Sequence, residues 1–74
     1  MKHDRIEMNP DVMNGRPVVR GTRITVELIL RKLGAGMSLA EILEAYPHLA
    51  VEDVRAAQAF AADYLAEETV YFTH

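Results

Sequence analysis

The strongest constraint on the fold is a helix start that the sequence marks at Ser38. Ser38 and Glu41 have the spacing of a capping box, in which the two side chains accept hydrogen bonds from backbone N–H groups that lack a helical partner. Residues 34–36 contain two glycines, which predict the end of an earlier helix. Pro47 ends the capped helix at Tyr46, because the residue before proline avoids the helical conformation. The chain therefore contains at least two short helices separated by a glycine break.

Helices are also predicted on both sides of this break. Thr25 is a suitable cap for a helix that begins at Val26, and Glu27 in its first turn interacts favourably with the helix dipole. A third helix is predicted over residues 51–66, although Ala50 is a poor cap for it. Its exposed residues are expected to include Glu52, Asp53, Asp63, Glu67 and Glu68. Its apolar stripe is expected to consist of Val54, Ala57, Phe60 or Ala61, Tyr64 and Leu65.

The residues before Val26 are predicted to form strands. Residues 5–8 alternate polar and apolar side chains, which is typical of a short strand. Residues 18–19 and 22–25 are β-prone, and Gly21 between them tolerates the positive φ of a tight turn, so these two runs predict a β-hairpin. The predicted fold class is mainly α, a three-helix helix-turn-helix bundle preceded by a short N-terminal strand and a β-hairpin. One domain is expected, with strand and hairpin in 5–25, a three-helix unit in 26–66 and a C-terminal tail in 67–74.

Charge is distributed unevenly along the 74 residues. Residues 1–36 hold seven basic and four acidic residues, whereas residues 37–74 hold one basic and seven acidic residues. A nucleic-acid binder collects its positive charge on one face, so any DNA contact is expected from the amino-terminal half. The candidate phosphate contacts are Arg16, Arg20 and Arg23, with further charge from Lys2, Arg5, Arg31 and Lys32. The candidates for contacts to base edges are Arg55 and Gln58.

A structural role for the hairpin arginines is the alternative to DNA contact. Arg16 or Arg23 is able to pair with Glu27, Asp11 or a backbone carbonyl, since arginine is well suited to bidentate ion pairs. Such a pair would hold the hairpin on the first helix. The sequence leaves both interpretations open.

The sequence does not predict an enzyme. The chain has no cysteine, and its only serine, Ser38, is used as a helix cap, so no nucleophile lies beside a base and an acid. None of the histidines has a partner at the helical spacing of a ligand pair, and His48 is interpreted as a turn residue, so no metal and no cofactor is predicted. Without a signal peptide or an apolar run of membrane length, a cytoplasmic protein without membrane contact is expected. A small domain without disulfides is further expected to form a homodimer.

Five short segments, spread over most of the chain, carry a family resemblance. They are NGRPVVRGTRI at 14–24, GMS at 36–38, EIL at 41–43, YPHL at 46–49 and EDVRAA at 52–57. Together they resemble the domain-of-unknown-function family 433 (DUF433), over roughly residues 5–66. The family usually has Thr or Ser where this chain has Ala50, so the third helix is expected to start less firmly here.

The resemblance implies a homeodomain-like or winged-helix-like fold and a role like that of VapB-type antitoxins. It implies a bacterial or archaeal protein of a type II toxin–antitoxin pair, whose partner is commonly a PIN-like ribonuclease toxin. Binding of double-stranded operator DNA by a helix-turn-helix dimer is a further expectation, whereas no catalytic residue is implied. Antitoxins often occupy the toxin with a tail, and the apolar character of residues 70–72 makes them candidate partner-binding residues: Val70, Tyr71 and Phe72.

The alternative function is a protein-interaction or dimerisation module that does not bind DNA. The hairpin arginines would then pair with an acidic partner surface, and the alanine-rich third helix would pack on another chain. The acidic half would imitate nucleic acid toward a nuclease by charge complementarity.

Overall fold

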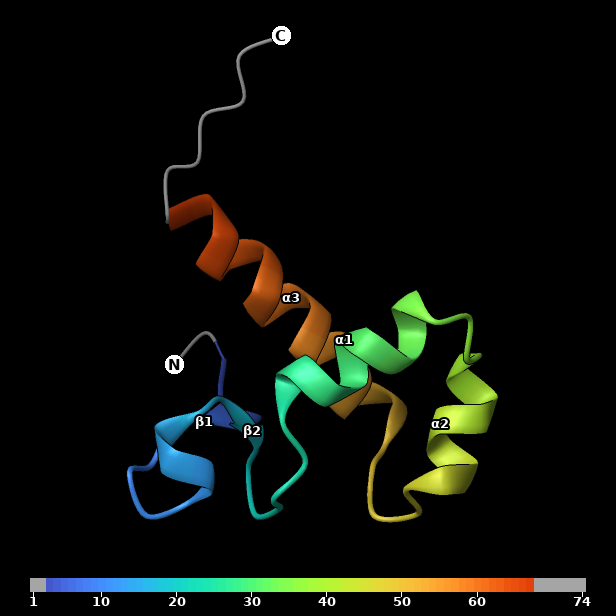
Figure 1. Cartoon of the computed structure of the whole chain (residues 1–74), viewed down its shortest axis with the longest axis horizontal. Coiled ribbons are helices and arrows are strands. Elements are labelled where there is room, and N and C mark those ends of the chain that lie inside the picture. The colour runs from blue at the N-terminus through green and yellow to red at the C-terminus, as the bar shows by residue number, and fades with distance from the viewer. Residues whose placement is uncertain (1–2, 68–74) are drawn as a thin grey trace, which may run out of the picture.

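The computed structural model describes residues 3–67 and consists of three helices preceded by a small sheet (Figure 1). These elements confirm the mainly α fold class. In chain order they are strand β1 (Ile6–Glu7), a 3-10 turn (Met13–Gly15), strand β2 (Val18–Val19), and helices α1 (Val26–Gly34), α2 (Leu39–Ala45) and α3 (Val51–Glu67).

The sheet pairs β1 with β2, and this differs from the predicted hairpin. The two strands run antiparallel, with Ile6 opposite Val19. Residues 22–24 are not a strand: the Thr22 backbone N–H donates to the Val19 carbonyl in a turn, and Gly21 within it has φ +80°. Thr25 forms an isolated bridge to β2, and its hydroxyl group already caps α1. The run from the turn to the helix is therefore too short for a strand.

Both ends of α1 are closed in the way that the sequence predicts, by a side-chain cap at the start and a glycine after the end. The Thr25 hydroxyl accepts a hydrogen bond from the Leu28 N–H at 3.0 Å. At the other end Gly36 has φ +98°, and the Met37 N–H donates to the Lys32 carbonyl. This arrangement is a Schellman motif, which satisfies carbonyl groups that have no partner within the helix. Gly36, rather than Gly34, is the residue that stops the helix.

The capping box of α2 is present as predicted. The Ser38 hydroxyl accepts from the Glu41 N–H at 3.1 Å, and the Glu41 carboxylate accepts from the Ser38 N–H at 2.8 Å. The backbone hydrogen bond from Ser38, followed by the contact with its hydroxyl group, lowers the pKa of the Glu41 carboxyl group from its ordinary value. The helix then ends before Pro47, as expected.

The start of α3 depends on Asp53, and the prediction that this residue lies on the exposed face was wrong. Asp53 is only 8% exposed. One of its carboxylate oxygens accepts from the Ala50 backbone N–H at 2.9 Å, and the other accepts from the Arg5 guanidinium at 3.0 Å. Asp53 thus supplies half of a capping box from inside the helix, which compensates for the missing side-chain cap at Ala50. The same carboxylate ties the segment before β1 to α3.

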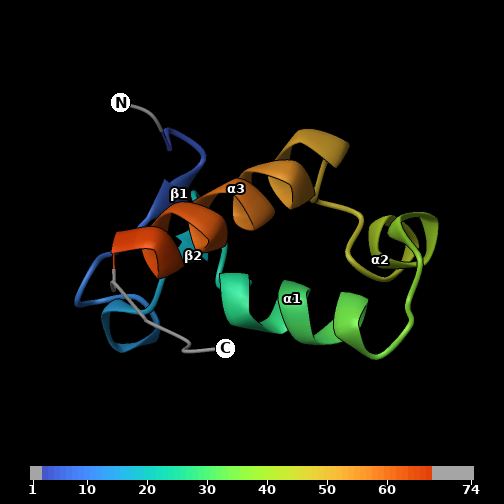
Figure 2. The same ribbon diagram turned by 90° about the horizontal axis from the view of Figure 1, so that it is seen from above.

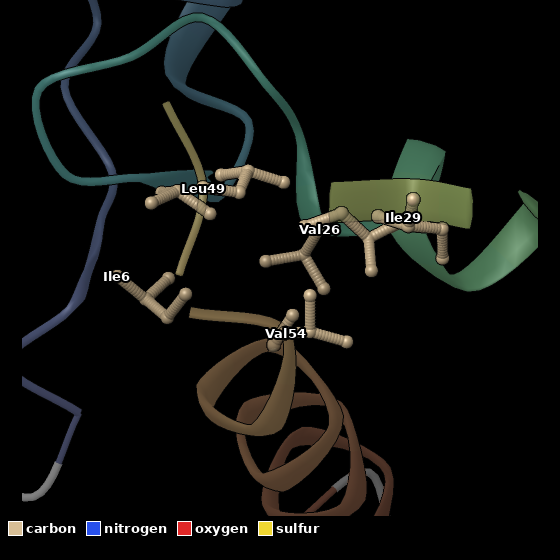
Figure 3. Close-up of a cluster of buried hydrophobic side chains, with 8 residues drawn as sticks. Ile6, Val26, Ile29, Leu49 and Val54 are labelled. Carbon is tan, nitrogen blue, oxygen red and sulfur yellow. The ribbon is translucent and has the colours of Figure 1, made fainter. Parts of the chain in front are cut away.

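The core lies where α1, α2 and the first half of α3 meet the sheet (Figure 3). Its eight members are at most 6% exposed, and they come from both strands, all three helices and the connection before α3: Ile6, Val19, Val26, Ile29, Ile42, Leu49, Val54 and Ala57. The predicted apolar stripe of α3 is correct only as far as Ala61. Tyr64 and Leu65 are exposed, because α3 has 17 residues and extends beyond the 9-residue helix against which it packs.

Candidate functional site

Three connections lie at one end of the molecule, away from the end of α3 (Figure 1). They are residues 9–16, 20–24 and 46–50. We call this end the arginine loop face, because it carries the three predicted phosphate contacts Arg16, Arg20 and Arg23, all of them exposed. The fold therefore brings these three residues to the same end, although β2 and the turn separate them along the chain.

Arg20 is held in place by the segment before β1. Its Nε donates to the Asp4 carbonyl at 2.6 Å, and its backbone N–H donates to the Arg5 carbonyl at 2.7 Å. The neighbouring Gly21 N–H donates to the Glu7 carboxylate at 3.0 Å. The Arg20 guanidinium thus has a carbonyl partner on Asp4, and its charge also interacts with that of the Asp4 carboxylate.

Arg16 and Arg23 have no carboxylate partner within the described part of the chain. The alternative prediction, a structural role, pairs Arg16 or Arg23 with Glu27, Asp11 or a backbone carbonyl. The structure instead pairs Glu27 with Arg31, four residues on, at 2.9 Å. Neither guanidinium is needed to hold the turn against α1, so both charges are available to a ligand.

A shallow hollow joins two of the three loops. It is lined by Arg20, Thr22, Arg23 and His48, among others. The sequence predicted His48 as a turn residue and did not associate it with the arginines. No local sequence pattern predicts this arrangement, because the hollow joins the turn after β2 to the connection between α2 and α3.

The loop before Arg16 has an unusual backbone. Met13 and Asn14 have φ angles of 49° and 59°, in the left-handed region that residues other than glycine rarely adopt. The Arg16 N–H donates to the Met13 carbonyl at 3.1 Å, which closes this turn directly before the arginine. Strained backbone of this kind is found preferentially at functional sites, and here it sets the position of Arg16.

The other predicted DNA contacts lie elsewhere. Arg31 and Lys32 are in the last turn of α1, at the opposite end of that helix from the arginine loops, and Arg31 is engaged by Glu27. Arg55 lies on the exposed face of α3, where its guanidinium approaches the Gln58 side-chain oxygen at 3.5 Å. The remaining candidates, Lys2, Val70, Tyr71 and Phe72, lie outside the described residues.

A second surface, the α1–α3 groove, was not predicted. Figure 2 shows α1 alongside α3 and running in the opposite direction, with the distal end of α3 extending past the start of α1. Between them lies an open groove of about 390 Å³ with a mainly apolar lining: Pro17, Val26, Glu27, Leu30, Arg31, Phe60, Ala61, Tyr64 and Leu65. The groove exists because the distal half of α3 has apolar side chains but no further element of residues 3–67 packed on them.

Aromatic contacts stiffen the opposite side of the distal half of α3. The His3 ring meets Phe60 edge-on, with ring centroids 5.4 Å apart, and its Nε2 lies 2.8 Å from the Asp63 carboxylate. Phe60 in turn stacks on Tyr64 at 6.1 Å. These contacts hold the segment before β1 against α3 and leave Tyr64 directed toward the groove lining.

Residues 3–67 contain neither a metal cluster nor a membrane span. No three His, Cys, Asp or Glu side chains in this range come together in a way that would hold a metal ion. None of the helices between these residues combines the length and the apolar character needed to cross a membrane.

Comparison with known proteins gives a family but no activity. Residues 6–61 match the family described as "Protein of unknown function (DUF433)". The chain is 41% identical over 56 residues to the uncharacterized protein y4eO of Sinorhizobium fredii, a match that covers 76% of this chain and a quarter of that protein. Its structure is similar to the crystal structure of a DUF433 member from Anabaena variabilis, with a TM-score of 0.79, 30% identity, and coverage of 85% of this chain and 62% of the other. The chain therefore belongs to the DUF433 family.

Proposed function

We propose that this protein is a DNA-binding regulator of the antitoxin type, which contacts DNA phosphates through the arginine loop face. The observation that carries the proposal is the set of three exposed guanidinium groups at one end of the fold, of which those of Arg16 and Arg23 have no carboxylate partner within residues 3–67. Arginine forms bidentate hydrogen bonds with phosphate, and such contacts fix the register of a protein on the duplex.

In this proposal the loops, rather than α3, make the main DNA contact. A recognition helix usually enters the major groove with its first turns. Here the first turn of α3 presents the exposed Glu52, and a carboxylate near the phosphates opposes binding. Arg55 and Gln58 follow one turn later and are the side chains of this helix that suit base edges.

The acidic helical half suits a second partner, a PIN-like ribonuclease toxin. This part of the proposal rests on the resemblance to antitoxins and on charge, since a ribonuclease collects positive charge in its RNA-binding cleft. Val70, Tyr71 and Phe72 are the proposed apolar anchors for such a partner. In both activities the protein acts as a cytoplasmic binding protein and not as an enzyme.

DNA binding is tested by salt-titrated fluorescence anisotropy on the DNA upstream of the gene. The variant is Arg16→Ala/Arg23→Ala, and the matched control is Lys32→Ala, because Lys32 lies in the last turn of α1, away from the arginine loops, and does not line the α1–α3 groove. Each lost phosphate contact is expected to reduce the slope of log K against log salt by about 0.9, so the double variant loses about 1.8 and the control keeps the wild-type slope. Equal slopes for wild type and double variant would contradict the proposed contact.

Toxin binding is tested by co-expression with the neighbouring gene, followed by pull-down and a growth assay. A small ribonuclease that co-purifies and is no longer toxic supports the antitoxin assignment. If a partner co-purifies but DNA is not shifted at low salt, the protein-interaction module without DNA binding is the better description. The exposed α1–α3 groove is the observation that favours this second candidate.

A further inference from the structure

The α1–α3 groove exposes large apolar side chains that the described chain leaves uncovered. Tyr64 is 52% exposed and Leu65 is 62% exposed, and both line the groove together with the less exposed Val26 and Ala61. Scattered apolar side chains on a surface are ordinary, but apolar residues that line one continuous groove indicate an interaction site.

We propose that this groove binds the same groove of a second copy of the chain, with the two α1 helices antiparallel across a twofold axis. In a twofold dimer the same patch lies on both sides, so it must be complementary to itself. The groove offers apolar side chains from both of its helices, because Leu30 of α1 lines it together with Tyr64 and Leu65 of α3.

Charge complementarity sets the orientation of the second copy. Glu27 and Arg31 both line the groove, on successive turns of α1, and their side chains are 54% and 75% exposed. When a second α1 is turned end for end, its Arg31 lies opposite Glu27 and its Glu27 lies opposite Arg31. The antiparallel arrangement therefore yields two attractive pairs, whereas a parallel arrangement places like charges opposite each other.

The size of the chain supports a second copy as the occupant. A domain of this size buries only about 60% of the surface of its unfolded chain. The core draws on eight residues, and the apolar surface of the distal half of α3 adds nothing to it beyond residues 60–61. Pairing of two grooves buries this surface without a disulfide, which the chain has no cysteine to form.

The dimer also determines where two arginine loop faces lie, a consequence that rests on the proposed function. Pro17 lines the groove, and it follows Arg16 directly in the chain. Two copies joined at their grooves therefore present two arginine loop faces, one on each side of the contact. The experiments below measure the oligomeric state without DNA, so a failure of the dimer is distinct from a failure of DNA binding.

The charge arrangement is tested by mixing two variants, Glu27→Arg and Arg31→Glu. In each variant alone, the antiparallel contact puts like charges opposite each other, and we expect the dissociation constant from analytical ultracentrifugation to rise about tenfold. In an equimolar mixture, one chain is positive at both positions 27 and 31 and the other is negative at both, so every opposed pair attracts and a heterodimer of wild-type affinity is expected. The intrahelical pair is absent from both variants, so only an intermolecular contact explains this recovery. A mixture that dissociates as readily as either variant alone overturns the proposal.

The apolar contact is tested with Leu65→Asp and a matched control, Ala62→Asp. Both variants add one negative charge to the same exposed stretch of α3, but Ala62 does not line the groove. Leu65→Asp is expected to be monomeric at concentrations where the control and the wild type are dimers. A wild type that stays monomeric up to its solubility limit overturns the proposal. If such a monomer dimerises once residues 68–74 are removed, the tail of the same chain is the occupant, and the proposal is equally overturned.

Discussion

The two halves of α3 share one apolar helical spacing but have different surroundings. In the first half, Val54 and Ala57 are buried in the core, and the Asp53 carboxylate has two hydrogen-bond partners. In the distal half, Tyr64 and Leu65 follow the same apolar spacing and remain exposed. Helical periodicity therefore identifies which face of a helix can be buried. It does not show over what length of the helix another element covers that face.

The first half of α3 contributes to the core, whereas the distal half is the part that we propose to take part in association. The first half of α3 meets the sheet, α1 and α2, so its side chains determine the stability of the monomer. The distal half of α3 and α1 together line the groove. Substitutions there are expected to change association more than the free energy of unfolding of the monomer.

The largest effect is expected for Ile29→Ala. Ile29 is 1% exposed in the core, so its truncation is expected to lower the free energy of unfolding by about 2–5 kcal/mol. The matched change in the exposed half, Leu65→Ala, is expected to alter it by less than about 0.5 kcal/mol. Urea denaturation measures both, at a protein concentration that keeps the chain monomeric. Equal losses for the two variants would show that the distal half of α3 belongs to the folding unit after all.

The next largest loss of stability is expected at one of two carboxylates, those of Asp53 and Asp63, which both hold the segment before β1 on α3. Asp53→Ala removes the partner of the Ala50 N–H and of Arg5, and its side chain is 12% exposed, so a loss of about 2 kcal/mol is expected. Asp63→Ala removes the contact with His3, but that carboxylate is 44% exposed, and a loss of about 0.5 kcal/mol or less is expected. Thermal unfolding followed by circular dichroism distinguishes the two. A larger effect at Asp63 would reverse the assignment of the two halves.

Most of the fold follows from local signals in the sequence. The Thr25 cap, the Ser38–Glu41 capping box and the stop at Pro47 depend on residues close in the chain, and the structure confirms them. The pairing of β2 with β1 is not local, because the loop of residues 8–17 separates the strands, and it was not predicted. Asp53 was misplaced for the same reason, since its partner Arg5 is 48 residues away. The predicted hairpin is present only as its turn and one antiparallel bridge between Val18 and Thr25.

The candidate site was predictable only as a set of charges. Arginines in the segment 16–23 indicate an anion-binding surface from composition alone. The position of His48 beside them, and the absence of carboxylate partners for Arg16 and Arg23 within residues 3–67, depend on how the loops meet. The groove depends on which part of α3 lacks a neighbour, and no local pattern carries that information.

A smaller effect is expected at the exposed end of α1, which is closed by the Schellman motif at Gly36. Gly36→Ala places a Cβ on a residue with φ +98°, and a loss of about 1–2 kcal/mol is expected from the left-handed backbone. Gly34→Ala is the matched control, because Gly34 is helical and an added Cβ meets nothing within 4 Å, so a gain of about 0.5 kcal/mol is expected. Urea denaturation of both variants measures this difference. A loss at both positions would mean that space, rather than backbone conformation, limits the end of α1.

The smallest effect concerns the pH dependence of the capped start of α2. The hydrogen bonds from Ser38 lower the pKa of the Glu41 carboxyl group in the folded protein, below the 4.5 of the unfolded chain. The unfolded state therefore binds the proton first as the pH falls. The contribution of Glu41 to stability is complete above pH 4.5 and is lost as the pH falls through the lowered pKa of the folded state.

Glu41→Gln tests this dependence, since glutamine keeps the hydrogen bond to the Ser38 N–H but carries no charge. The variant is expected to be less stable than wild type at pH 7 and equally stable once the pH is well below the lowered pKa of Glu41, where both side chains are neutral. Glu44→Gln on the same helix is the control, because Glu44 takes no part in the capping box, and its difference from wild type is expected to be smaller at pH 7. Urea denaturation across this pH range gives both curves. If the Glu41→Gln curve runs parallel to that of wild type, the start of α2 gains nothing from the carboxylate charge, and the capping box acts through its neutral hydrogen bonds alone.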